Sequence, residues 1–170
     1  MSDTENSYVL INDLGERYVE VPVKPETRKY FLHINKSRDG YVRTRIDSLL
    51  GIALGIGTEK DTYRKRKLRR KIPGTRIKLV LSQSLTHGKL KESTLVAIGQ
   101  LLDKTFRECF FMYVRGAVKT GCSDNYAVCK FLDEFGITEE DWTMDTAKKA
   151  YRDYMAVAPG FENRNAALRF

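Results

Sequence analysis

Lysine and arginine side chains are concentrated between residues 60 and 78, and the chemistry of such a group is the binding of anions. This stretch carries ten basic side chains and one acidic side chain, Asp61. The residues before it carry eight basic and nine acidic side chains, and those after it carry twelve of each. The excess positive charge of the chain, formally +8, therefore lies in this stretch, which we call the basic segment.

The basic segment predicts a polyanionic partner. Clustered like charges repel one another and disfavour compact structure unless anions are nearby. Nucleic acid is the commonest such partner, and the planar donor fork of arginine suits phosphate. An acidic protein partner, or a solvated loop that serves only solubility, is the alternative. A membrane surface is disfavoured because no aromatic-rich amphipathic helix adjoins the segment. The cations expected to hold phosphates are Arg64, Lys65, Arg66, Lys67, Arg69, Arg70, Lys71, Arg76 and Lys78.

A second basic group occurs near the C-terminal end. The pattern from Ser123 to Met155 predicts a helix, a turn at Gly136 and another helix, as in a helix-turn-helix. In a DNA-reading unit of that kind, the second helix presents basic side chains to the major groove. Nearby acids weaken the positive field, so a plain helical hairpin used for packing stays open. The candidate groove contacts on the second helix are Lys148, Lys149 and Arg152.

The sequence offers no pattern typical of catalysis or metal binding. His33 and His87 have no ligand or triad partner at the required spacing. The glycines of 51–57 lack the arrangement of a phosphate-binding loop. Clustered acids between Asp133 and Asp141 suit magnesium, but their place at the end of one helix and the start of the next is typical of capping. We therefore expect a non-enzymatic protein without a metal or cofactor.

Cysteine usage and hydropathy bear on the compartment. Three cysteines, an odd number without CxxC spacing, predict neither a disulfide framework nor a zinc ribbon. The longest uncharged apolar run, 49–57, is less than half of the roughly 20 residues that span a bilayer. The polar start of the chain lacks the features of a secretory signal. We expect a protein without a membrane span that resides in the cytoplasm or within a virion.

The elements around the basic segment predict a small α+β portion. Tyr8–Ile11 and Arg17–Val23 are β-prone runs on either side of a turn, so they predict a hairpin, in which Pro22 suits an edge position. Short helices are expected at 26–34 and 49–56, and further strands at 41–46 and 76–81.

The stretch from Lys91 to Lys119 predicts one long amphipathic helix. Towards its end Phe110, Phe111 and Val114 widen the apolar face, so we expect other helices or a second subunit to cover these residues. A homo-oligomer through this surface is the corresponding prediction. The expected buried stripe is Leu95, Ile98, Leu102, Phe106, Cys109, Tyr113 and Ala117.

Two shorter helices are expected after the long one. Ser123 predicts the N-cap of the first helix and Gly136 its end. Thr138 and Asp141 resemble a capping box that starts the second helix. The fold class is therefore predicted as α+β, with an N-terminal hairpin and short mixed sheet and a C-terminal three-helix, helix-turn-helix-like portion. The expected portions are 1–85, which contains the basic segment 60–78, and 86–170.

Three stretches of the chain resemble uncharacterised small basic proteins of phages and mobile elements of gut anaerobes. They are VKPETRKYFL at Val23–Leu32, RIKLVL with the basic stretch before it at Arg76–Leu81, and FLDEFGITEEDWTMDTAKKAYRDY at Phe131–Tyr154. The resemblance covers roughly a third of the sequence and transfers no catalytic residue. It implies a phage or mobile-element setting, which is compatible with DNA binding and equally with a virion component.

These observations together predict a non-enzymatic nucleic-acid-binding protein in an accessory or regulatory role, with DNA as the favoured nucleic acid. The alternative is a virion or other structural and assembly protein whose basic segment meets acidic neighbours. The sequence leaves the type of nucleic acid, any target sequence and the oligomeric state open.

Overall fold

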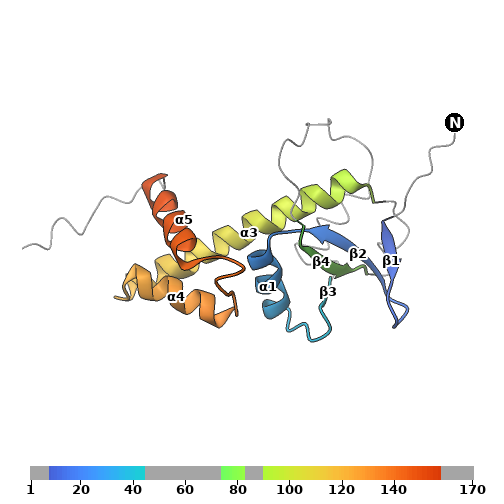
Figure 1. Cartoon of the computed structure of the whole chain (residues 1–170), viewed down its shortest axis with the longest axis horizontal. Helices are drawn as coiled ribbons and strands as arrows, with labels where there is room; N and C mark the ends of the chain where they lie inside the picture. The colour runs from blue at the N-terminus through green and yellow to red at the C-terminus, as the bar shows by residue number, and fades with distance from the viewer. Residues whose placement is uncertain (1–7, 45–73, 83–89, 158–170) are drawn as a thin grey trace, which may run out of the picture. The chain divides into compact units, whose positions relative to one another are not determined.

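The computed structural model describes residues 8–44, 74–82 and 90–157. It has an α+β fold, as predicted (Figure 1). The chain divides into two compact units, Met1–Phe106 and Arg107–Phe170, which are described separately below. The described elements are β1 (Val9–Ile11), β2 (Arg17–Pro22), α1 (Pro25–Ile34), β3 (Tyr41–Arg43), β4 (Arg76–Val80), α3 (Glu92–Lys119), α4 (Asp124–Glu134) and α5 (Met144–Val157).

Within the described residues of the first unit, four strands form one mixed sheet in the order β1-β2-β4-β3. β1 and β2 form the predicted antiparallel hairpin, in which Leu10 lies opposite Tyr18. β4 pairs antiparallel with β2 and parallel with β3. Residues directly opposite each other across a ladder share a face of the sheet. Val19 and Leu79 therefore lie on one face, and Tyr18 and Val80 lie on the other.

Pro22 lies in an inner strand, but at a position where the β1 side of that strand has no described pairing. β2 is an inner strand with β4 on one side and β1 on the other. Val23 donates a hydrogen bond of 3.0 Å to the carbonyl oxygen of Thr75, so the nitrogen of Pro22, one residue earlier, points to the β1 side. The described pairing of β1 extends only as far as Val19, so the missing N–H of the proline interrupts no described ladder bond.

One face of the sheet is the core of the first unit. Its valine, isoleucine and leucine side chains have no exposed surface: Val19, Val21, Val42, Ile77 and Leu79. The first part of α3 covers this face through the buried side chains Leu95, Ile98 and Leu102. The alternation of apolar residues with period two on β2 and β4, and the three-and-four spacing on α3, are what allow these elements to share one core.

α3 comes unusually close to the end of β2 at Gly99. A Cβ atom at this position would overlap the carbonyl oxygen of Pro22 and lie 3.4 Å from Cγ1 of Val21. One turn further along, the carboxylate of Asp103 accepts a hydrogen bond of 3.1 Å from the backbone N–H of Lys24. Gly99 and Asp103 therefore fix the first part of α3 on the strand.

α1 begins at Pro25, one residue before the predicted range 26–34, and ends at Ile34 as predicted, with Asn35 as its C-cap. Its buried residues include Tyr30 and Phe31, and the ring of Tyr30 lies 5.4 Å from that of Phe106 in α3. The loop after α1 contains Lys36, whose φ of 50° is in the left-handed region, and leads into β3.

In the second unit, the buried stripe of α3 differs from the predicted one. Phe110 and Val114 have no exposed surface, whereas the predicted Cys109, Tyr113 and Ala117 are only half-buried. Phe110 contacts the rings of Phe131 in α4 and Trp142, at centroid distances of 5.1 and 4.8 Å.

The widened apolar face of α3 is covered within the chain itself. Phe110 and Val114 are fully buried there, and the half-buried ring of Phe111 stacks on Tyr154 of α5 at 4.2 Å. Burial of Phe110 and Val114 removes the reason for assigning them to a subunit contact. The oligomeric state itself stays a prediction.

The predicted caps of α4 are confirmed, and the start of α5 is later than expected. The Ser123 hydroxyl accepts a hydrogen bond of 3.2 Å from the N–H of Tyr126, and Gly136 follows the helix with a φ of 60°. Asp141 accepts a hydrogen bond of 2.9 Å from the N–H of Thr138, as in a capping box, but this box closes a separate turn. Helix α5 begins only at Met144, after the buried Trp142.

The helix-turn-helix-like part of the prediction is not confirmed. α4 and α5 are joined by residues 135–143, which is longer than the three- or four-residue turn typical of that motif. The division of the chain into two compact units falls inside α3, between Phe106 and Arg107. The expected portions 1–85 and 86–170 stay a prediction. The predicted helix at 49–56 and the end of the predicted strand 41–46 lie outside the described residues.

Candidate nucleic-acid interface

Of the predicted phosphate contacts in the basic segment, Arg76 and Lys78 are described by the structure. Both lie on β4, which continues the chain from the basic segment into the centre of the sheet. Arg76 is exposed and Lys78 is half-buried. The other seven lie outside the described residues: Arg64, Lys65, Arg66, Lys67, Arg69, Arg70 and Lys71.

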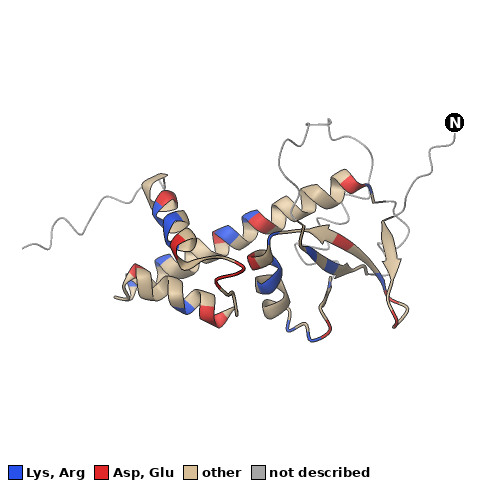
Figure 2. Cartoon of the chain, in the orientation of Figure 1, with Lys and Arg blue, Asp and Glu red and all other residues tan. Residues whose placement is uncertain are grey.

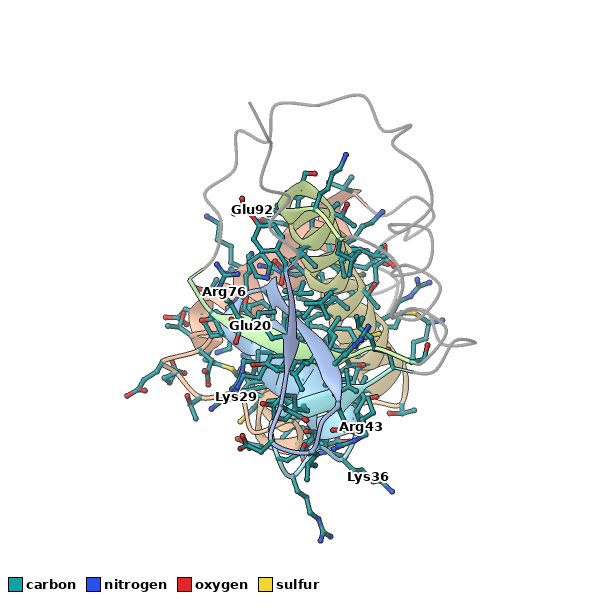
Figure 3. All side chains as sticks on the ribbon, turned by 90° about the vertical axis from the view of Figure 1, so that its right-hand side faces the viewer. Glu20, Lys29, Lys36, Arg43, Arg76 and Glu92 are labelled. Carbon is teal, nitrogen blue, oxygen red and sulfur yellow. The ribbon has the colours of Figure 1, made fainter. Side chains whose placement is uncertain are left out.

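Arg76 and Lys78 belong to the face of the sheet opposite α3, which we call the open face. The ladder register places on it Tyr18 and Glu20 of β2, Arg76 and Lys78 of β4, and Tyr41 and Arg43 of β3. Glu20 and Arg76 are labelled near each other in Figure 3, and the register makes them diagonal neighbours. These six side chains are half-buried or exposed, whereas Pro22 and Val80, which the register also places on this face, are buried.

The centre of the open face is a group of two tyrosines and a lysine. The rings of Tyr18 and Tyr41 meet edge to face, with centroids 5.1 Å apart and an angle of 85° between the planes. The ammonium group of Lys78 lies 4.9 Å from the centroid of Tyr41 and 5.7 Å from that of Tyr18. The quadrupole of each ring attracts the cation. Lys78 makes no ion pair in the described part of the chain, although Glu20 is directly opposite, so its charge is not neutralised there.

Arg43, in contrast, is fully engaged in binding two loops together. Its Nε and Nη2 atoms donate hydrogen bonds of 3.0 Å to the two carboxylate oxygens of Glu16, and Nη2 donates one of 2.8 Å to Asp39. These bonds lower the pKa of Asp39 to about 2 and also lower the pKa of Glu16. Arg43 therefore links the β1–β2 turn to the loop before β3, and its charge is balanced.

A shallow basic hollow of about 310 Å³ lies beside this ion-pair cluster. It is formed by the loop between α1 and β3, and Tyr41 of the open face lines it together with Lys36, Arg38 and Arg43. Lys36 and Arg38 are exposed and make no ion pair within the residues that the structure describes. The hollow thus carries two unneutralised cations next to the aromatic group.

The second predicted group of cations lies on α5, in the second unit. Lys149 and Arg152 are exposed and Lys148 is half-buried. Acidic side chains lie on either side of the basic ones along α5 in Figure 2, and the first turn carries Asp145. The carboxylate of Glu139 accepts a hydrogen bond of 3.1 Å from the N–H of Met144, which places a negative charge at the helix start. This arrangement is unfavourable for a recognition helix, whose first residues approach the bases between two rows of phosphates.

The acidic residues around the α4–α5 connection have local hydrogen-bonding roles. Glu134 accepts a bond of 2.6 Å from the hydroxyl of Tyr113, and Glu139 and Asp141 bond to backbone N–H groups. The carboxylate of Asp133 raises the pKa of the Cys129 thiol, the opposite of what a nucleophilic cysteine needs.

Neither a metal-ligand cluster nor a membrane-spanning helix occurs among the residues that the structure describes. Among residues 8–44, 74–82 and 90–157, no group of three or more histidine, cysteine or acidic side chains is placed to hold a metal ion. No helix in those same ranges has the length and apolar character needed to cross a membrane.

Sequence reasoning missed the aromatic group and the hollow. Tyr18 and Tyr41 are separated by 23 positions and belong to different strands, so only the strand pairing brings them to Lys78. A usable signal was present, since Tyr18 alternates with the buried Val19 and Val21 and so had to point away from the core. Lys36 and Arg38 lie in a loop that the sequence marks only as a connection.

No protein-family model, curated protein or solved structure matches the chain. The resemblance to proteins of phages and mobile elements therefore stays a prediction, and the function is argued from the residues alone.

Proposed function

We propose that this protein binds nucleic acid without catalysing a reaction, through the basic segment and the open face of the sheet. The observation that carries the proposal is the concentration of the whole positive excess in residues 60–78, a stretch that enters the sheet at β4. DNA is the favoured nucleic acid, and an accessory or regulatory role in the cytoplasm, in a phage or mobile-element setting, belongs to the same proposal.

The described end of the basic segment supports this assignment. Arg76 is exposed, and neither Arg76 nor Lys78 forms an ion pair within the described part of the chain. Lys36 and Arg38 add two further cations beside the same face. Exposed cations without acidic partners are what phosphate contacts require, since each contact releases condensed counterions from the nucleic acid.

Charge reversal in the basic segment tests the proposal. In a variant with Arg66, Lys67, Arg69 and Arg70 replaced by glutamate, affinity for fluorescently labelled nucleic acid should fall by at least a hundredfold, because four attractive contacts become repulsive. If about six cations contact duplex phosphates, the logarithm of the wild-type affinity should fall with the logarithm of salt concentration with a slope near −5. Titrations at several salt concentrations, followed by fluorescence anisotropy, measure both quantities.

A matched control is available in the second unit. Reversal of Lys148, Lys149 and Arg152 changes a similar amount of charge on α5, where acids flank the cations, and should reduce affinity much less. Circular dichroism checks that both variants fold. Wild-type binding with no salt dependence, or unchanged affinity in a folded variant with the basic segment reversed, would exclude the proposed contact.

A further inference from the structure

The open face differs from a purely electrostatic surface because it places aromatic rings between cations. Tyr18 and Tyr41 come from the two strands that flank β4, and Lys78 of β4 lies between them. Their rings are half-buried, so each retains exposed surface. A duplex needs only cations for backbone contact, whereas exposed rings provide a surface on which unpaired bases can stack.

Cations lie on more than one side of the aromatic group. Arg76 lies at one end of β4, the ammonium group of Lys78 lies over the two rings, and Lys36 and Arg38 line the hollow that Tyr41 shares. In Figure 3, Arg76 and Lys36 are labelled at opposite ends of the sheet region. A single nucleic-acid strand that passes from Arg76 to the hollow would therefore meet cation, aromatic group and cation in turn.

The ammonium group of Lys78 is held in place by the rings and not by an acid. It lies 4.9 Å from the centroid of Tyr41, while Glu20, directly opposite on β2, makes no ion pair with it. A phosphate that approaches this position gains the lysine charge without breaking a salt bridge. A base can then replace the ammonium group over a ring face, since both use the same π surface.

We propose that the open face binds single-stranded nucleic acid, with Tyr18 and Tyr41 stacking on unpaired bases and Lys78 and Arg76 contacting the phosphates between them. This inference rests on the proposed nucleic-acid-binding function and adds the class of ligand. Stacking requires bases that are free of a partner strand, so the two tyrosines contribute to the binding of single strands and not to that of duplexes.

The test compares two probes and two tyrosine variants. The probes are a labelled oligothymidylate of about 20 nucleotides, longer than the roughly 4–16 nucleotides that one OB-fold domain covers, and a labelled GC-rich duplex. In Tyr18→Leu/Tyr41→Leu, affinity for the oligothymidylate should fall about tenfold for each ring that stacks on a base. Affinity for the duplex should change less than twofold. Tyr18→Phe/Tyr41→Phe keeps both rings and should retain oligothymidylate affinity.

Tyr126→Leu is the matched control, because this tyrosine is 59% exposed on α4 of the second unit and should leave both affinities unchanged. If the leucine variant does not fold, the NMR spectrum of the wild-type protein tests the same contact. Stacked bases should shift the ring-proton NMR signals of Tyr18 and Tyr41 upfield when oligothymidylate is added, and leave those of Tyr126 in place.

The outcomes separate this inference from the proposed function. Unchanged oligothymidylate affinity in the folded leucine variant, or unshifted ring signals in the bound wild type, overturns the stacking role. If charge reversal in the basic segment still abolishes binding in that case, the proposed function stands without it. If the wild-type protein binds neither probe at low salt, both proposals fail.

Discussion

Gly99 provides a direct test of how the first part of α3 packs on the sheet. In Gly99→Ala, the new methyl group would overlap the carbonyl oxygen of Pro22 and lie 3.1 Å from its carbonyl carbon. Both clashing groups belong to backbone, so no side-chain rotation can relieve the overlap. The helix must shift, and the fully or almost fully buried Leu95, Ile98 and Leu102 must shift with it.

The expected loss of stability follows from two opposing terms. Alanine in a helix interior is more favourable than glycine by about 1 kcal/mol. Overpacking a close contact usually costs about 1–3 kcal/mol, and a backbone overlap belongs at the upper end of that range. We therefore expect Gly99→Ala to lower the free energy of unfolding of the first unit by about 2 kcal/mol.

Gly116→Ala is the matched control on the same helix. A Cβ atom at Gly116 meets nothing within 4 Å, so only the helix propensity acts, and this variant should gain up to about 1 kcal/mol. Urea unfolding followed by far-UV circular dichroism gives the overall stability. Amide hydrogen exchange of β2 reports the first unit, and the fluorescence of Trp142 reports the second. Equal stability of the two variants would refute the close approach of α3 to β2.

Three further predictions concern single interactions. The folded pKa of Asp39, about 2, is below its ordinary value of 3.8, so its pairing with Arg43 stabilises the fold above pH 4, and this contribution is lost as the pH falls from 4 to 2. Arg43→Gln should reduce that dependence in thermal unfolding at each pH, and an unchanged acid profile would contradict the ion-pair geometry. The Thr27 hydroxyl is buried without a hydrogen-bond partner in the described part of the chain, so Thr27→Val should raise the free energy of unfolding by about 1 kcal/mol in urea titrations; a loss of stability would indicate a missed partner. The bond from Tyr113 to Glu134 raises the pKa of Tyr113 from 10.0 to about 12, so its contribution is present below pH 10 and lost between pH 10 and 12. Tyr113→Phe should remove the last tyrosinate to appear in an ultraviolet titration.

Local patterns in the sequence were sufficient to predict the described elements. Alternation along β2, proline at the first turn of α1 and the serine cap of α4 each act within a few residues, so the chain sequence contains the whole cause. The same is true of Gly136, whose positive φ ends α4.

The errors occur where a distant partner decides between two local solutions. The second half of α3 carries apolar residues on adjacent sides, and the position of α4 and α5 selects Phe110 and Val114 over Cys109 and Tyr113. The capping box at Thr138 forms as predicted, but the next residue after the box, Trp142, is buried against Phe110, and the helix starts only after it. In each case the local signal is correct, and a tertiary contact determines its consequence.

The candidate site shows the same division between local and distant causes. Charge is additive along a sequence, so the basic segment was visible without a structure, and Arg76 and Lys78 were assigned to it by counting. The aromatic group depends on the parallel pairing of β3 with β4. The basic segment lies between these two strands in the sequence, and local preferences do not predict that strands so far apart will pair. β4 lies between the strands that carry Tyr18 and Tyr41, and the most basic part of the chain directly precedes β4. The chain between β3 and β4 thus contains the proposed phosphate contacts, and the pairing of the strands at its two ends helps to bring the two rings together.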